Sequence, residues 1–147
     1  DRTRSVISAT GRMYQMYNQH FGTIPVAVTG NSPVPAPEYP AGGDQPRVNA
    51  GSATYPLDLS AALTADRKAL VVAVVNATEQ PQSMKLALEG FKARATGRCW
   101  KLTGASLDAQ NQVGKTPEVV IAEGTFGVNA ALKIAPISVE LYEFKRA

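Results

Sequence analysis

Apolar residues at the start of the chain recur every three or four positions, a spacing that predicts an amphipathic helix over residues 5–21. Its apolar face is formed by Val6, Ala9, Met13, Met16, Tyr17 and His20. No capping motif precedes the helix, and Gly22 stands where a left-handed C-cap belongs. A solitary helix of this length is marginal in water. We therefore expect its face to pack either on the strands of this chain or on a domain outside it, and the strands alone are not expected to cover the whole stripe.

A stretch rich in proline and glycine follows, over residues 29–47. Such a composition sustains neither a helix nor a central strand. We interpret it as an ordered but irregular crossing between two units.

Beyond this crossing the apolar period changes to two, which is typical of strands. Residues 70–75 are apolar on both faces, as in a central strand, and residues 84–88 alternate like a half-buried partner strand, with Lys85 on the solvent side. Further strands are predicted over residues 53–59, 98–102, 118–122, 129–134 and 137–144. The predicted fold is mainly β, an antiparallel jelly-roll-like β-sandwich preceded by one amphipathic helix.

The composition limits the chain to one sizeable core with an appendage, since 44% of its 147 residues are hydrophobic. The formal charge of +3 comes from scattered side chains, and no basic stripe interleaves with aromatics, so we expect no nucleic-acid partner. No apolar run reaches the roughly 20 residues of a membrane helix, and no membrane partner is expected. The first residue is Asp1 rather than Met, so we expect a longer parent protein.

The residues that could hold a metal are too few for a site. The sequence contains one histidine, His20, and one cysteine, Cys99, so neither a clustered metal site nor an intrachain disulfide is expected, and no cofactor is predicted. His20 lies on the apolar helix face and is interpreted as a core or interface residue. Cys99 precedes Trp100 on a predicted strand and is interpreted as a buried, inert thiol.

Paired carboxylates are the usual machinery of glycoside cleavage. Most acidic residues here fall at predicted turns or on the outward side of predicted strands. The acids considered are Glu38, Asp58, Asp66, Glu79, Glu89, Asp108, Glu118, Glu123, Glu140 and Glu143. We expect no pair among them to be catalytic, and no substrate-binding residue is assigned.

Several polar and aromatic residues have both a functional and a structural interpretation. Asp108 could touch substrate or calcium, but we favour Asp108 and Asn111 as loop-forming residues that bond to nearby backbone. Asn76 begins a formal glycosylation acceptor, Asn-Ala-Thr, and is favoured as a turn former. Four aromatics could form a sugar-stacking platform but are more typical of core and rim: Tyr39, Tyr55, Trp100 and Tyr142.

Four phrases, in order, resemble the C-terminal end of family 51 glycoside hydrolases, the α-L-arabinofuranosidases and related endoglucanases. The phrases are residues 12–22, residues 70–76, residues 107–111 with Pro117 and Val120 behind them, and residues 136–139. The resemblance implies that residues 1–22 are the last helix of a (β/α)8 barrel, residues 23–52 a traverse and residues 53–147 the β-sandwich.

In that family both catalytic glutamates lie on barrel strands, which would precede residue 1, and neither maps onto this chain. Some relatives place a sugar-contacting glutamine just ahead of the last helix, where this chain has Ser8, Ala9 and Thr10. The substrate of the parent, arabinofuranoside or β-glucan, is therefore left open by the resemblance.

The resemblance implies a non-catalytic sandwich that supports the barrel and oligomer contacts of a retaining glycosidase. The implied partners are the catalytic barrel, a polysaccharide bound by the parent enzyme and further copies in a homo-oligomer. Two other classes of function remain open. One is a carbohydrate-binding module, which requires an exposed row of aromatics, and the other is a free-standing interaction domain.

Overall fold

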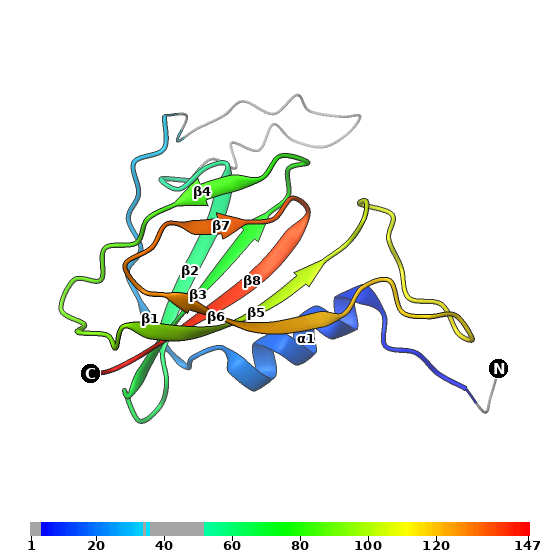
Figure 1. The fold of residues 1–147 in the computed structure, drawn as a ribbon, viewed down its shortest axis with the longest axis horizontal. Helices are drawn as coiled ribbons and strands as arrows, with labels where there is room; N and C mark the ends of the chain where they lie inside the picture. The colour runs from blue at the N-terminus through cyan, green and yellow to red at the C-terminus, as the bar shows by residue number, and fades with distance from the viewer. Residues whose placement is uncertain (1–3, 34, 36–51) are drawn as a thin grey trace, which may run out of the picture.

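The structure is a computed structural model that describes residues 4–33, 35 and 52–147, and over these residues it is mainly antiparallel β with one helix (Figure 1). The elements are α1 Ala9–His20, β1 Ile24–Val26, β2 Leu57–Leu63, β3 Ala69–Asn76, β4 Gln82–Met84, β5 Thr96–Thr103, β6 Ile121–Gly127, β7 Leu132–Ile134 and β8 Ser138–Lys145. Six strands form one sheet in the order β1-β2-β3-β8-β5-β6, and β4 pairs with β7. The predicted fold class, a β-sandwich preceded by one helix, is confirmed.

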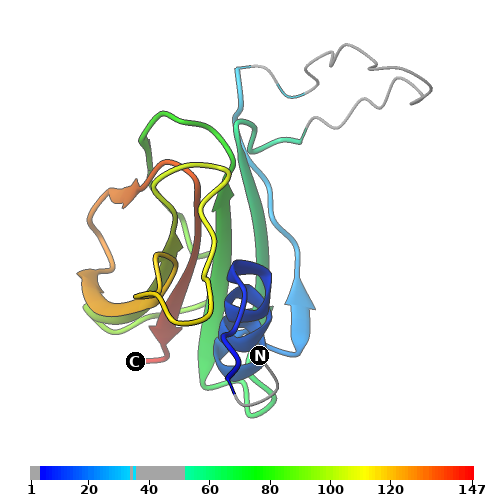
Figure 2. The same ribbon diagram turned by 90° about the vertical axis from the view of Figure 1, so that its right-hand side faces the viewer.

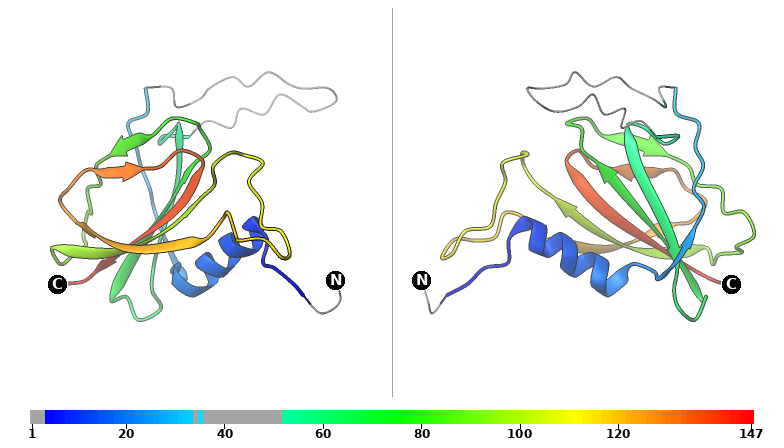
Figure 3. Two further views of the ribbon diagram at one scale, coloured as in Figure 1. Left: turned by 45° about the vertical axis from the view of Figure 1, so that its right-hand side comes forward. Right: turned by 180° about the vertical axis from the view of Figure 1, so that it is seen from behind.

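The six-stranded sheet is covered on both faces near its centre. The β4–β7 pair lies over one face and α1 over the other, as the turned views show (Figures 2 and 3). On β3, Leu70, Val72 and Val74 point into the inner core, which is the cluster beneath β4–β7. Val71 and Ala73 point into the helix-side core beneath α1. The prediction of a central strand that is apolar on both faces is therefore confirmed.

The helix has a start that its sequence pattern did not reveal. Ser8 is the N-cap, and its Oγ accepts a hydrogen bond from the Gly11 amide at 3.0 Å, so the predicted start at residue 5 and the lack of a cap are both wrong. Residues ahead of Ser8 cannot continue the helix because the cap has extended geometry.

The end of the helix also differs from the prediction. Phe21 is the C-cap in extended geometry, and Gly22 does not adopt a left-handed conformation. A Cβ on Gly22 would lie 2.5 Å from the Leu63 carbonyl oxygen, so the glycine permits a close approach to β2.

The apolar face of α1 packs on the sheet of the same chain. Met16 is fully buried against Trp100 and Leu141 in the helix-side core. Four other apolar residues of the helix and its C-cap pack around it: Ala9, Met13, Tyr17 and Phe21. The expectation that the sandwich leaves this stripe uncovered is therefore wrong for its centre. The outward side of the helix exposes Tyr14.

Four predicted strands are displaced from the observed ones. Residues 53–56 form turns, so β2 begins only at Leu57. The side chain of Asn111 holds Val119 in a loop, and β6 begins after it. Residues 84–88 keep the alternating burial that was predicted, with Lys85 exposed. The strand β4 itself spans only residues 82–84, because its partner β7 is equally short. The predicted strand over residues 129–134 is reduced to β7.

Part of the predicted crossing, together with Glu38 and Tyr39, lies outside the described residues. Ahead of this crossing, β1 pairs with β2 as an edge strand. The domain boundaries at residues 22 and 52 stay predictions. No helix in the described ranges combines the length and apolar character needed to cross a membrane.

Candidate functional site

Glu140 is buried completely on β8, among polar partners inside the sandwich. Its Oε1 accepts hydrogen bonds from the Ala135 amide at 2.8 Å and the Ser138 hydroxyl at 3.2 Å. Its Oε2 accepts a hydrogen bond from the Tyr142 hydroxyl and lies 2.7 Å from Lys101 Nζ. The prediction that acidic residues lie at turns or on outward faces is wrong for Glu140. Burial of a carboxylate costs several kcal/mol unless it is paired and hydrogen-bonded, and here both oxygens are satisfied.

The partners of Glu140 connect three strands. Lys101 Nζ comes from β5, donates to the Lys133 carbonyl of β7 at 3.2 Å and lies 5.5 Å from the centre of the Tyr142 ring. Burial and the bond to Glu140 raise the pKa of Tyr142 far above its ordinary value, so its hydroxyl stays a donor. This arrangement fixes β7 against β5 and β8. It leaves no oxygen of Glu140 exposed to a substrate.

Two asparagines act as loop-forming residues. The fully buried Asn76 donates to the Gln80 and Ala135 carbonyls, both at 2.9 Å, and accepts from the Thr78 amide and hydroxyl, which confirms the turn-forming interpretation. Its amide nitrogen is therefore occupied rather than presented to a glycosylating enzyme.

Asn111 closes the long loop between β5 and β6. It exchanges two hydrogen bonds of 2.8 Å with the backbone of Val119 and donates to the Ile7 carbonyl at 3.0 Å, which ties the loop to the segment before α1. The loop-forming interpretation is confirmed for Asn111. Asp108 is exposed in the same loop and makes no such bond in the described structure.

His20 lies at the contact between the end of α1 and the sheet. Its ring stacks on Trp100 with centroids 3.9 Å apart and an interplanar angle of 11°, and the Arg98 guanidinium lies 4.9 Å from the same indole. Arg98 also pairs with Glu123, whose pKa is lowered mainly by that hydrogen bond. Partial desolvation has the largest effect on the pKa of His20 and lowers it, and the positive charge of Arg98 lowers it further. The negative charges of Glu123 and Glu143 oppose this shift. His20 therefore lies in an interface, as interpreted from its position on the helix.

The remaining candidates from the sequence lie in the interior. Cys99 is 4% exposed, and burial raises the pKa of its thiol, so the prediction of a buried thiol is confirmed. Trp100 and Tyr142 are buried in different cores, and Tyr55 is partly buried. Trp100 and Tyr142 therefore contribute nothing to an exposed sugar platform. Among the described residues, no group of three acidic, histidine or cysteine residues could hold a metal ion.

A shallow apolar groove of about 250 Å³ lies between the start of α1, the β5–β6 loop and the residues before β8. Met13, Leu102, Val119 and Val139 line it, with the hydroxyls of Thr10 and Ser138. Neither a carboxylate nor a basic side chain lines it. The groove therefore provides apolar packing surface rather than acid–base chemistry.

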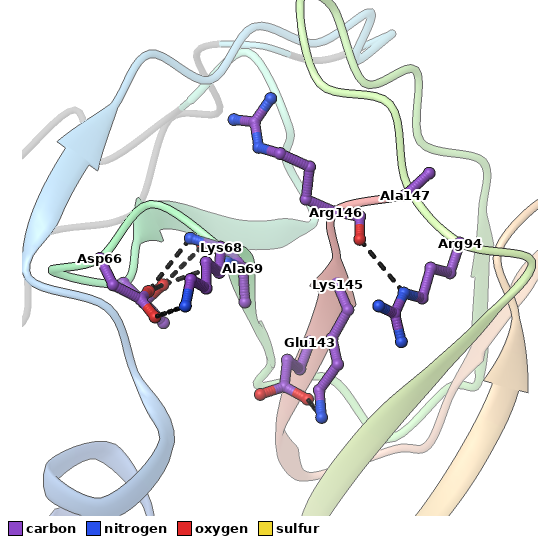
Figure 4. A pocket seen from close by; sticks show the side chains of 9 residues that line it. Asp66, Lys68, Ala69, Arg94, Glu143, Lys145, Arg146 and Ala147 are labelled. Atoms are coloured by element: carbon purple, nitrogen blue, oxygen red, sulfur yellow. Dashed lines mark hydrogen bonds and ion pairs between the residues drawn. The ribbon is translucent and has the colours of Figure 1, made fainter.

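A charged cleft of about 560 Å³ lies at the opposite end of the sheet, where the β2–β3 turn meets the end of β8 (Figure 4). We use the term charged cleft for the space lined by Thr64, Asp66, Lys68, Ala69, Arg94, Glu143, Lys145, Arg146 and Ala147. Four of these side chains are cationic and two are acidic. Sequence reasoning missed this cleft because Lys68 and Arg94 are distant in sequence from residues 143–146.

The two carboxylates of the charged cleft are paired differently from a glycosidase acid and base. Asp66 accepts from the Thr64 hydroxyl at 2.6 Å and the Lys68 amide at 3.0 Å, and these bonds lower its pKa. Glu143 lies 3.8 Å from Lys145 Nζ. A general acid requires a raised pKa, and Asp66 has the reverse. Glu143 and the buried Glu140 point to opposite faces of the sheet, because they are three positions apart on one strand.

No family model matches the chain, and no curated protein matches it. Solved structures do resemble it. The family 51 α-L-arabinofuranosidase from Thermotoga petrophila RKU-1 matches with a TM-score of 0.72 and 20% identity over 94% of this chain and 29% of that chain. The α-L-arabinofuranosidase from Thermotoga maritima, solved with arabinose, matches with a TM-score of 0.72 and 20% identity over 95% of this chain and 29% of that chain.

A third match is the family 51 arabinofuranosidase from Xanthomonas axonopodis pv. citri, with a TM-score of 0.53 and 17% identity over 74% of this chain and 21% of that chain. This chain therefore spans less than a third of the length of these enzymes. The chain has the fold of a part of the family 51 α-L-arabinofuranosidases, and the resemblance predicted from its sequence is confirmed at the level of the fold.

Proposed function

We propose that this chain is the non-catalytic C-terminal portion of a retaining glycoside hydrolase that acts on plant cell-wall polysaccharide, of arabinofuranosidase or endoglucanase type. In this proposal it stabilises a catalytic barrel and provides oligomer contacts. The observation that carries the proposal is the match over 94% of this chain to only 29% of an arabinofuranosidase. A segment with that coverage corresponds to one part of a larger enzyme.

The surface around α1 supports a contact with another unit. Tyr14 on the outward side of the helix is 63% exposed, and Ile7 ahead of the helix is 43% exposed. The β5–β6 loop, which Asn111 ties to this region, exposes Leu107, Val113 and Val120. Large apolar side chains exposed on neighbouring segments are typical of interaction surfaces.

Three acidic residues support a non-catalytic role for the described part of the chain. Glu140 has no exposed oxygen, Glu123 is paired with Arg98, and Asp66 is hydrogen-bonded within its own turn. A retaining glycosidase needs two carboxyl groups about 5–5.5 Å apart on either side of the scissile bond. None of these three side chains is available for that arrangement without losing its present partners.

The proposal is tested by assaying the pure 147-residue chain with an aryl arabinofuranoside and with β-glucan, together with intact-mass analysis of a preparation from the source organism. We expect no hydrolysis by the chain alone, and co-purification of the chain with, or within, a larger polypeptide that does hydrolyse one substrate. Hydrolysis by the pure chain, or a native protein that contains only these residues, would refute the proposal.

A carbohydrate-binding module is the second candidate, and the burial of Trp100 and Tyr142 weakens it. A self-contained interaction domain is favoured by one observation, namely that the sheet of the chain itself buries Met16 of α1. Intact-mass analysis separates this candidate from the first, because a self-contained domain requires no larger polypeptide.

A further inference from the structure

The charged cleft has unequal numbers of opposite charges. Its cationic side chains are Lys68, Arg94, Lys145 and Arg146, and its acidic side chains are Asp66 and Glu143. The ammonium groups lie 4.0 Å and 3.8 Å from the nearest carboxylate oxygens of Asp66 and Glu143. These distances exceed the roughly 2.7–2.9 Å of a charge-assisted hydrogen bond. The cations are therefore only loosely paired, and their donors can turn to another anion.

The two arginines are held by their Nε atoms, which leaves their terminal nitrogens for a ligand. Arg94 Nε donates to the Arg146 carbonyl at 3.2 Å, and Arg146 Nε donates to the Arg67 carbonyl at 3.3 Å. The Arg146 guanidinium also lies 4.5 Å from the centre of the Phe91 ring. Each guanidinium carries five N–H donors, and within the described residues the terminal nitrogens of both have no acceptor. A fork of this kind matches a carboxylate in two-point geometry.

Glu143 supplies the complementary feature. Its Oε2 is a buried atom that accepts no hydrogen bond from any described residue, and its side chain lines the charged cleft (Figure 4). Buried acceptors in native structures are satisfied with few exceptions. The Glu143 side chain as a whole is 17% exposed, and a ligand hydroxyl can donate to the carboxylate through this exposed part. Asp66 already accepts two bonds at Oδ1, and its Oδ2 faces Lys68 at 4.0 Å, so it can accept a second hydroxyl.

We propose that the charged cleft binds a small organic acid that is rich in hydroxyl groups, of the class of a hexuronic acid. The acid carboxylate pairs with Arg94 and with the neighbouring cations, and the sugar hydroxyls donate to Glu143 and Asp66. The volume of about 560 Å³ falls within the roughly 300–1,000 Å³ of small-molecule sites. The charged lining disfavours an apolar ligand, and the two carboxylates disfavour a compact polyanion such as phosphate. All these side chains belong to this chain, so the site does not depend on a neighbouring barrel.

The test is a titration of the isotope-labelled 147-residue chain with sodium glucuronate, followed by NMR at the backbone amides. We expect saturable shifts at the amides of residues 66–69 and 143–147, and binding that weakens when NaCl is raised from about 0.05 to about 0.5 M, because salt screens exposed charges. Glucose, which has the hydroxyls without the carboxylate, should bind at least about tenfold more weakly. Equal binding of glucose and glucuronate would overturn the proposal.

Variants and a second anion locate the site and define the ligand. Arg94→Gln should weaken glucuronate binding at least about fivefold, whereas Lys85→Gln, which removes an exposed cation outside the cleft, should leave it unchanged. Inorganic phosphate that binds as tightly as glucuronate would overturn the assignment to a hydroxyl-rich acid. An unchanged affinity in Arg94→Gln, in a variant whose reference spectrum shows it to be folded, would overturn the location. Tri-galacturonate that binds more tightly than the monomer identifies a polysaccharide as the source, and weaker binding identifies the free acid.

Discussion

Replacing Lys101 by methionine tests whether the ion pair with Glu140 holds the sandwich together. The substitution retains most of the aliphatic stem and removes the only cation within reach of the buried carboxylate in the described structure. Glu140 has no exposed surface, and Lys101 is 34% exposed in its side chain. Breaking a buried pair from one side costs about 3–5 kcal/mol. Because water reaches the lysine, we expect about 3 kcal/mol, a large part of the 5–15 kcal/mol typical of a domain.

The assay is urea unfolding at neutral pH, followed by circular dichroism, for Lys101→Met, Glu140→Gln and the double variant. Glu140→Gln should cost about 1–3 kcal/mol because the amide keeps part of the hydrogen bonding. The double variant should be more stable than the sum of the single costs predicts, by about 1 kcal/mol or more, because neither charge is left alone.

The exposed pair between Arg98 and Glu123 provides a matched control on the same sheet. Both side chains are about half exposed, so Glu123→Gln should shift the urea midpoint much less than Lys101→Met does. A destabilisation by Lys101→Met that is no larger than that of this control would refute the role of the ion pair. Costs of the two single substitutions that add within about 0.5 kcal/mol would refute it equally, because independent sites behave in that way.

Three further predictions follow from burial and charge. Val72→Asp should abolish the folded circular dichroism spectrum, because it leaves an unpaired charge in the inner core. Lys85→Asp, on the exposed side of its segment, should leave the melting curve nearly unchanged, and equal effects of the two substitutions would contradict the strand register. Met16→Ala should destabilise the chain by about 2–5 kcal/mol and speed amide exchange in α1, and fast exchange of this helix in the unmodified monomer would contradict its packing on the sheet. The pKa of His20 is lowered on folding, so stability is complete above the ordinary histidine pKa of about 6.5 and falls as the pH decreases through it. Because His20 is the single histidine, the melting temperature of His20→Gln should lose the pH dependence that the unmodified chain shows between about pH 7.5 and 5.5. An unchanged pH dependence in this variant would refute the assignment to His20.

The sequence predicted the strands whose residues are apolar on both faces and failed where a strand end depends on a distant partner. Residues 70–75 could be placed at the centre of a sheet because no polar residue interrupts them. The end of β4 could not be predicted, because the alternation of Met84, Leu86 and Leu88 continues after the partner strand stops. The start of β6 depends on Asn111, eight positions before Val119. Such constraints are tertiary and leave no local pattern.

The polar features of the interior were only partly predictable. Glu140 lies an even number of positions from Tyr142 and Phe144 on the same strand, so its side chain points to the same face of the sheet as these two bulky residues of the inner core. This alternation was a signal in the sequence that the acid points inward. Its partner Lys101 comes from another strand, and no sequence rule connects the two. The charged cleft was beyond prediction for the same reason, because Arg94 meets residues 143–146 only after the sheet has formed.

The position of β8 determines when this sheet can be completed during synthesis. It is the last strand in chain order, yet it lies between β3 and β5 and pairs with both along its length. Until β8 leaves the ribosome, β1–β2–β3 and β5–β6 are separate antiparallel units that expose strand edges. Exposed edges of this kind are sites of aggregation and of incorrect pairing. A nascent chain arrested between residues 127 and 138 therefore contains both halves of the sheet and lacks the strand that joins them, so we expect such a chain to aggregate or to pair its strands incorrectly more readily than the completed one.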